Sequence, residues 1–145
     1  MPIPTKAADL DLASSLRLAV MRLGRRLRAQ RSDESLSLTQ LAALATLVHH
    51  GAMTPTALAD HEKVQPPSMT RVIAALTERG LVERLDHEHD RRQCVITITP
   101  TGRTVVLEDR RRRDAWLTRQ LAQLTAEERD TLRAAVPLLV RVSEA

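Results

Sequence analysis

Residues 65–102, QPPSMTRVIAALTERGLVERLDHEHDRRQCVITITPTG, decide the fold of this chain. The stretch begins with Pro66 and Pro67, which lack backbone N–H donors and are therefore tolerated only in the first turn of a helix. After them, apolar side chains recur at the spacing of one helical face: Met69, Val72, Ile73 and Leu76. The opposite face carries small and polar groups: Ser68, Arg71 and Ala75, with Thr70 beside them. We therefore predict a helix that buries one face and leaves the other free.

The second half of the stretch predicts a β-hairpin. Two short runs of strand-forming residues, Leu81 to Leu85 and Cys94 to Thr99, flank a polar and charged loop over residues 86–93. In the second run two sets alternate, as in a strand with two faces: Cys94, Ile96 and Ile98, and Val95, Thr97 and Thr99. Pro100 and Gly102 are expected to end the sheet.

Local signals upstream predict two more helices. Ser37 and Gln40 form a capping box, and Gly51 stands where a helix C-terminal glycine belongs. Thr54, followed by a proline, marks the start of a short helix that ends near Glu62. A short helix, a tight turn and a second helix with a small polar face are typical of a helix-turn-helix. The hairpin that follows makes the expected unit a winged helix-turn-helix.

Long amphipathic helices flank this unit. After a loose arm over residues 1–8, a first helix rich in arginine starts at Asp9, and its arginines face either solvent or DNA. Its apolar stripe is Leu12, Leu16, Val20, Leu23 and Leu27. A further helix spans about 101–121, and a second capping box at Thr125 starts a last helix, which Pro137 should kink or weaken. The last apolar stripe is Leu132, Val136, Leu139 and Val142. The expected fold is mainly α with a small two-stranded β-hairpin.

The composition indicates an anionic partner. Lysine and arginine number 22 against 18 acids, and the net charge of +4 favours nucleic acid first and an acidic membrane surface second. Most of the basic residues are arginine, which suits bidentate contacts to phosphate or guanine, although a GC-rich genome would give the same bias. The core must be aliphatic, because Trp116 is the one aromatic residue. No apolar run reaches the roughly 18 residues of a membrane span, and no signal-type segment appears, so we expect a cytoplasmic protein without a membrane partner.

The predicted DNA contacts lie on the free helix face and on the hairpin loop. No acid occurs from Lys63 to Thr77, so no carboxylate there repels the phosphates. Hydroxyls and an arginine on the helix can donate to phosphates or base edges, and loop arginines suit a narrow minor groove. The predicted contacts are Gln65, Pro67, Ser68, Thr70, Arg71, Arg91 and Arg92. Asp90 is expected to pair with a nearby arginine and fix the shape of the wing. Taken singly, each of these residues has an alternative explanation. Ser68 would be a capping group of the first helical turn, Arg71 a solvated side chain, and the hairpin loop an ordinary solvated turn.

Residues 68–102 resemble the MarR family of bacterial transcription regulators. The matching pieces are Thr70-Arg71, Arg79-Gly80-Leu81-Val82-Glu83-Arg84, Asp90-Arg91-Arg92, and Ile98-Thr99 before Pro100-Thr101-Gly102. The resemblance implies a homodimer, with dimerisation helices at 1–35 and 103–145 around a DNA-binding region at 36–102. Two such regions would bind double-stranded DNA at a pseudo-palindromic operator, with half-sites about one helical turn apart, and act as a repressor. Many members release DNA when a small, often aromatic, anion binds between the dimer base and the DNA lobe.

Two features limit what the resemblance implies. The first helix has no cysteine, so the type of oxidation sensing that uses one there is not supported. Cys94 is interpreted as a small buried hydrophobe in the wing strand. The chain has no Phe or Tyr to line a pocket for an aromatic effector, so the sequence leaves a small-molecule effector open and does not identify the residues that would bind it.

No cofactor, metal or catalytic site is predicted. A single cysteine excludes a disulfide or a four-cysteine zinc site within one chain. The histidines are interpreted as surface groups: His49, His50, His61, His87 and His89. The chain has no Gly-rich phosphate loop and no HExxH motif, so it is not expected to be an enzyme. The competing interpretations are a winged-helix protein-interaction module and a nonspecific, nucleoid-type DNA binder.

Overall fold

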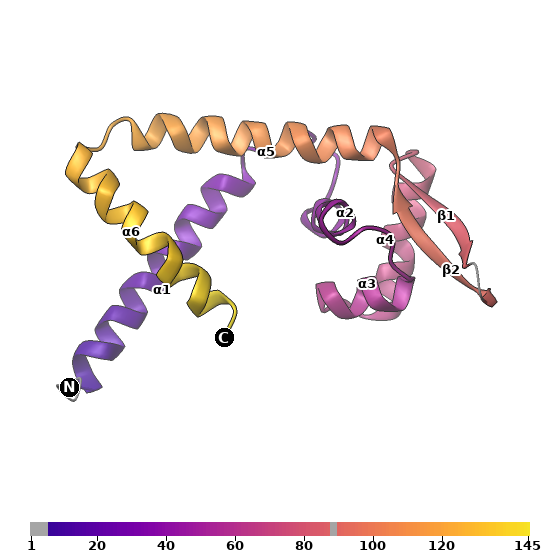
Figure 1. The fold of residues 1–145 in the computed structure, drawn as a ribbon, viewed down its shortest axis with the longest axis horizontal. Helices are drawn as coiled ribbons and strands as arrows, with labels where there is room; N and C mark the ends of the chain where they lie inside the picture. The colour runs from indigo at the N-terminus through magenta and orange to yellow at the C-terminus, as the bar shows by residue number, and fades with distance from the viewer. Residues whose placement is uncertain (1–5, 88–89) are drawn as a thin grey trace.

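The computed structural model describes residues 6–87 and 90–145, and Figure 1 shows a mainly helical chain with one β-hairpin. The elements are α1 (Lys6–Arg28), α2 (Leu38–His50), α3 (Pro55–Glu62), α4 (Pro66–Glu78), β1 (Val82–His87), β2 (Asp90–Ile98), α5 (Pro100–Leu121) and α6 (Ala126–Ser143). The two strands pair antiparallel. The predicted fold class, mainly α with a winged helix-turn-helix, is confirmed.

Helix α5 is a long rod that joins two parts of the molecule (Figure 1). Near its N-terminus lie α2, α3, α4 and the hairpin, and α6 follows its C-terminus. Toward that second end, α1 contacts α5 through Trp116, a buried residue. The guanidinium carbon of Arg26 lies 5.4 Å from the centroid of the Trp116 ring, which is a cation–π contact.

The hydrophobic core belongs to the winged helix-turn-helix and to the first half of α5. Apart from Met69 its large side chains are aliphatic, as the composition required: Leu36, Leu41, Leu44, Leu47, Leu58, Met69, Ile73, Leu76, Leu81, Val82, Ile96 and Val106. The loop before α3 is tied to the hairpin, because Met53 N donates to Ile96 O at 3.0 Å and Ile96 N donates to Met53 O at 2.7 Å. The helix-turn-helix and the wing therefore share one core.

Side-chain caps set the starts of α2, α3 and α6 at the predicted residues. The Ser37 hydroxyl accepts from Gln40 N at 3.1 Å, while the Gln40 side chain accepts from Ser37 N at 2.8 Å. Thr54 caps α3 in the same way, and a second capping box at Thr125 starts α6. Gly51, with a φ of 80°, ends α2 as predicted, because a left-handed φ costs glycine little.

The hairpin is longer than the sequence predicted. β1 starts at Val82 and not at the expected Leu81. It runs to His87 and β2 starts at Asp90, so much of segment 86–93, expected as a loop, is strand. Pairing is regular from Val82 to Asp86, and an irregularity follows before the last pair. The hydrogen bonds that pair two strands come from the backbone. A charged segment can therefore pair as well as an apolar one where its side chains remain in solvent.

Three smaller expectations were wrong. α1 begins at Lys6, so residues 6–8 belong to the helix and not to a loose arm. Thr99 lies outside the strand, and its hydroxyl accepts from Gly102 N at 3.1 Å to cap α5. Gly102 lies inside α5, where a Cβ would stand 2.2 Å from Leu81 O. Close packing of α5 against the end of α4, and not a turn, explains this glycine.

Candidate nucleic-acid interface

The turn between α3 and α4 packs the second helix against the first. Lys63 adopts the left-handed conformation with a φ of 54°, and Val64 N donates to Ala59 O at 3.0 Å. α4 then starts at Pro66, with Gln65 as its N-cap residue and no side-chain cap bond. Because two prolines open the helix, the amide donors that its first turn leaves unpaired belong to Gln65 and Ser68.

Helix α4 buries one face and exposes the other, as predicted. Met69, Ile73 and Leu76 are buried in the core, while Val72, predicted to be buried, is half-buried. All five predicted contact residues of this helix and its cap are exposed: Gln65, Pro67, Ser68, Thr70 and Arg71. The Thr70 hydroxyl donates to Pro66 O at 3.0 Å, which leaves its oxygen free to accept. On this acid-free face the Ser68 hydroxyl and Arg71 can donate to phosphates and base edges, while the Thr70 oxygen can accept from a base amino group.

The wing supplies a second exposed segment beside α4. β1 packs against α4, and Glu83 and Arg84 point to solvent. The backbone of Asp90, Arg91 and Arg92 lies in β2, but their side chains lie outside the described residues. Their roles as two DNA contacts and one shape-setting acid therefore stay predictions. Cys94, predicted to be buried, is half-buried against the core.

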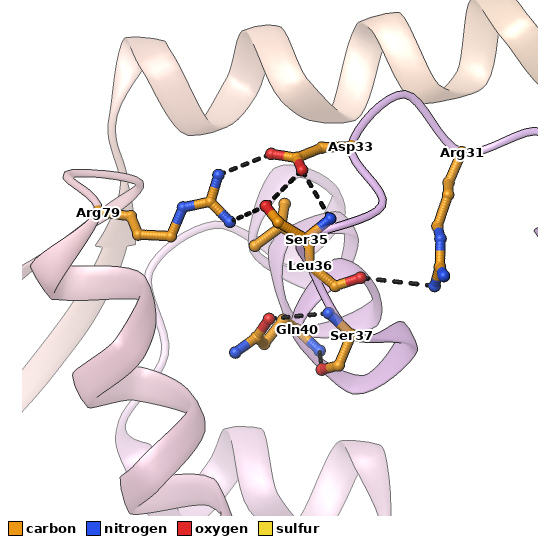
Figure 2. Close-up of polar contacts among 7 residues, drawn as sticks. All are labelled: Arg31, Asp33, Ser35, Leu36, Ser37, Gln40 and Arg79. Atoms are coloured by element: carbon orange, nitrogen blue, oxygen red, sulfur yellow. Dashed lines mark hydrogen bonds and ion pairs between the residues drawn. The ribbon is translucent and has the colours of Figure 1, made fainter.

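The far end of α4 carries an ion pair that the sequence did not indicate. The Arg79 guanidinium donates to Asp33 Oδ2 at 2.6 Å and to Ser35 Oγ at 2.9 Å, as Figure 2 shows. The hydrogen bond from the Ser35 hydroxyl, followed by that from Arg79, lowers the pKa of Asp33 from 3.8 to about 2. Partners 46 residues apart leave no periodic signal in a sequence.

A cavity of about 690 Å³ lies between α1, α2 and α5. Asp109 of α5 is buried beside it, accepts from Ser32 N at 3.1 Å and pairs with Arg113 at 2.6 Å. Arg28 and Arg110 also line the cavity, and Arg113 Nε is buried there without a hydrogen-bond partner. The lining also includes the carboxylate of Glu62, so three guanidinium groups stand against two carboxylates, and the excess positive charge favours an anion. Sequence reasoning missed the cavity because its lining comes from elements far apart in the chain.

The histidine rings at the ends of α2 and α3 pack on one another. The ring centroids of His49 and His50 are 4.7 Å apart, and those of His50 and His61 are 4.8 Å apart. Among the side chains that the structure describes, which exclude those of residues 1–7 and 87–93, no group of three or more His, Cys, Asp or Glu could hold a metal ion. Within residues 6–87 and 90–145, each helix is too short or too polar to cross a membrane.

Comparisons with known proteins agree with this geometry. The family model described as MarR family matches residues 36–94. An uncharacterized HTH-type transcriptional regulator of Mycobacterium bovis is 50% identical over 133 residues, which cover 92% of this chain and 93% of the relative. The HTH-type transcriptional repressor MdtR of Bacillus subtilis is 28% identical over 127 residues, covering 85% of this chain and 81% of MdtR.

Solved structures match over nearly the whole chain. A putative transcriptional regulator of Pseudomonas aeruginosa aligns with a TM-score of 0.86 and 30% identity, covering 97% of this chain and 99% of that one. BpsR of Bordetella bronchiseptica, whose DNA binding is regulated by 6-hydroxynicotinic acid, aligns with a TM-score of 0.66 and 26% identity, covering 92% and 93%. The fold is a winged helix-turn-helix with an exposed face on α4. The family model matches its DNA-binding region, and a transcriptional regulator is 50% identical over nearly the whole chain. The chain therefore belongs to the MarR family of DNA-binding transcriptional regulators.

Proposed function

We propose that the protein is a sequence-specific repressor that binds a pseudo-palindromic operator as a homodimer. One observation carries the proposal: α4 buries its apolar face in the core and exposes Ser68, Thr70 and Arg71 on a face without acids. In this proposal α4 and Gln65 contact the major groove, while Arg91 and Arg92 of the wing contact the adjacent minor groove. MdtR, a relative, is named a repressor, which supports the same role here.

The homodimer is supported by apolar surface that one chain leaves uncovered. α6 runs through Pro137 to Ser143 and has no buried residue. The exposed apolar side chains of α1 and α6 include Leu12 at 66%, Val20 at 51%, Val136 at 55% and Val142 at 67%. Such surface is typical of a protein–protein interface. We propose that residues 1–35 and 103–145 join two chains around the DNA-binding regions at 36–102.

We propose further that a small organic anion binds in the cavity and releases DNA. The guanidinium groups of Arg28, Arg110 and Arg113 line the cavity and support an anionic ligand. BpsR, a structural neighbour, supports the same idea, because 6-hydroxynicotinic acid regulates its DNA binding. An effector releases DNA when it binds better to a conformation unsuited to the operator. A panel of aromatic and aliphatic monocarboxylates should include one that displaces labelled operator from the wild type and not from Arg113→Gln.

A mobility-shift assay tests DNA recognition. The protein should shift its own upstream DNA at lower concentration than a scrambled duplex, at several salt concentrations. Equal affinity for both duplexes would indicate a nonspecific binder, and no shift at any salt concentration would favour a protein-interaction module.

We also propose that the protein is not an enzyme, because its family consists of transcriptional regulators. Binding to chromosomal DNA would place it in the cytoplasm.

A further inference from the structure

Three side chains tie the linker between α1 and α2 to the end of α4. Arg79 donates to Asp33 Oδ2 at 2.6 Å and to Ser35 Oγ at 2.9 Å, and Ser35 N donates to Asp33 Oδ1 at 2.9 Å (Figure 2). The Ser35 hydroxyl donates to the same Asp33 oxygen. We name Asp33, Ser35 and Arg79 the linker clamp. Together these four hydrogen bonds join the linker between α1 and α2 to the end of α4.

The linker clamp lies where three parts of the chain meet. Arg79 is the C-cap residue of α4 and thus lies at the opposite end from Pro66. The residue before Asp33, Ser32, donates its N–H to the buried Asp109 of α5 at 3.1 Å. The linker is therefore fixed to the rod that leads to α6, and the linker clamp fixes the end of α4 to the linker.

A second set of contacts holds the residues that directly follow α4. The Thr99 hydroxyl donates to Gly80 O at 2.7 Å, and Thr99 N donates to Leu81 O at 3.1 Å. One contact alone would act as a pivot, whereas two separate contacts restrict rotation of the helix further. Because α4 rises by about 1.5 Å per residue, a tilt of about 10° at this end would move its DNA-facing end by roughly 3 Å.

We propose that the linker clamp positions α4 relative to the dimer helices and so decides which spacing of half-sites the homodimer accepts. The inference rests on the proposed function, because spacing has meaning only for two DNA-binding regions in one dimer. Arg79 is in this view a positioning residue, and its partner is a carboxylate and not a phosphate. An error of a few ångströms in each half of a dimer shifts its contacts out of register with the operator.

The alternative is that Arg79, whose side chain is 39% exposed, contacts a phosphate directly. The two roles predict opposite signs for a change at Asp33. Removing a negative charge near DNA should strengthen binding by electrostatics alone, and would also free the Arg79 guanidinium for a phosphate. If the carboxylate instead positions α4, its removal should weaken binding.

The test compares wild type, Asp33→Asn, Arg79→Gln and the double variant on operators whose half-site spacing is changed one base pair at a time. Asp33→Asn and Arg79→Gln should each lower affinity for the best spacing about fivefold, the factor that a well-formed partly exposed ion pair supports. Both should flatten the dependence of affinity on spacing. The double variant should lose no more than either single one, because both act through one contact.

Glu34→Gln is the matched control, because it removes the same charge from the next, exposed residue. It should bind as tightly as the wild type or more tightly, with an unchanged spacing profile. Tighter binding by Asp33→Asn, or a spacing profile like that of the wild type, would overturn the inference.

A measurement without DNA separates the inference from the proposed function. Spin labels at Ser68→Cys and Arg119→Cys, in a Cys94→Ser background diluted with unlabelled chain, report the distance from the start of α4 to the end of α5. The distance distribution should broaden in Asp33→Asn and not in Glu34→Gln, and equal widths would count against the linker clamp. If the wild type does not prefer operator to scrambled DNA, the proposed function fails while this distance still decides the positioning role.

Discussion

At the scale of single residues, contact chemistry and packing explain different positions of the same winged unit. Arg71 is exposed on α4 and is available to a base or phosphate. Gly102 is buried, and its missing side chain lets α5 approach Leu81. Asp33 lies between Ser35 and Arg79, which keep its carboxylate charged. Changes at these residues should therefore alter, in turn, DNA specificity, stability and the pH dependence of stability.

Arg71→Ala should reduce sequence preference. If the guanidinium contacts a base edge, its removal should cost about 1–3 kcal/mol of discrimination between operator and random DNA. Fluorescence anisotropy with both duplexes at one salt concentration measures the ratio of affinities. A ratio equal to that of the wild type would contradict base contact by this residue.

Gly102→Ala should destabilise the protein. A Cβ at this position would stand 2.2 Å from Leu81 O and 2.8 Å from the side chain of Ile98, so the backbone must shift, at about 1–3 kcal/mol. Urea unfolding at constant protein concentration measures the loss. The matched control is Gly24→Ala in α1, where a Cβ would meet the far end of Arg28 at 3.4 Å. That change should be neutral or stabilising by up to about 1 kcal/mol, because alanine favours a helix.

Asp33 should make stability depend on acid pH. Its pKa is about 2 in the folded chain, below the value of 3.8 for an unperturbed group, so the folded state binds this proton less readily. The stabilisation is therefore present above about pH 4 and is lost as the pH falls toward about 2. The difference in unfolding free energy between wild type and Asp33→Asn should shrink across that window. A difference that is constant with pH would show that the carboxylate charge does not stabilise the fold.

At the scale of elements, local chemistry was predictable and long-range pairing was not. The caps at Ser37, Thr54 and Thr125 and the prolines that open α4 lie within four residues of the backbone they affect, so the sequence located these helix starts. The ends of the hairpin depend on pairing between strands, and the expected loop over 86–93 was too long. The ion pair between Arg79 and Asp33 and the cavity join distant segments, which no local pattern indicates.

The wing should contribute to affinity for DNA of any sequence. Arg92→Ala should weaken binding to operator and random DNA alike and reduce the slope of log affinity against log salt by about 1. The control is Arg119→Ala, which removes an exposed arginine at the far end of α5. A slope that changes equally in both variants would indicate a general charge effect and not a contact made by the wing.

At the scale of the whole molecule, the uncovered apolar faces of α1 and α6 contrast with the closed core around α4. The core holds the helix-turn-helix, the wing and the start of α5 in one body. Beyond Trp116, α5 leads into α6, none of whose residues is buried. One chain thus has a closed core in its DNA-binding region but leaves the apolar faces of α1 and α6 exposed to solvent. We therefore expect two copies to cover these faces by packing against each other.

The protein should sediment at twice the chain mass of 16.2 kDa at micromolar concentration. Val136→Glu places a charge on the exposed face of α6 and should shift the mass toward that of one chain, with a parallel loss of operator affinity. Leu85→Glu is the control for sedimentation, since Leu85 is similarly exposed, at 49%, but lies in β1, outside the proposed dimerisation regions. Dissociation by both variants, or by neither, would contradict an interface built from α1 and α6.

The stacking of Arg26 on Trp116 has a practical consequence. With one tryptophan and no tyrosine, the chain has a single ultraviolet emitter, and it lies where the first helix meets the central rod. A change in its emission wavelength or quenching reports on the surroundings of Trp116 at that junction, without an attached dye. Titration of unlabelled protein with DNA or with small anions would therefore show whether binding of either ligand changes the contact between α1 and α5.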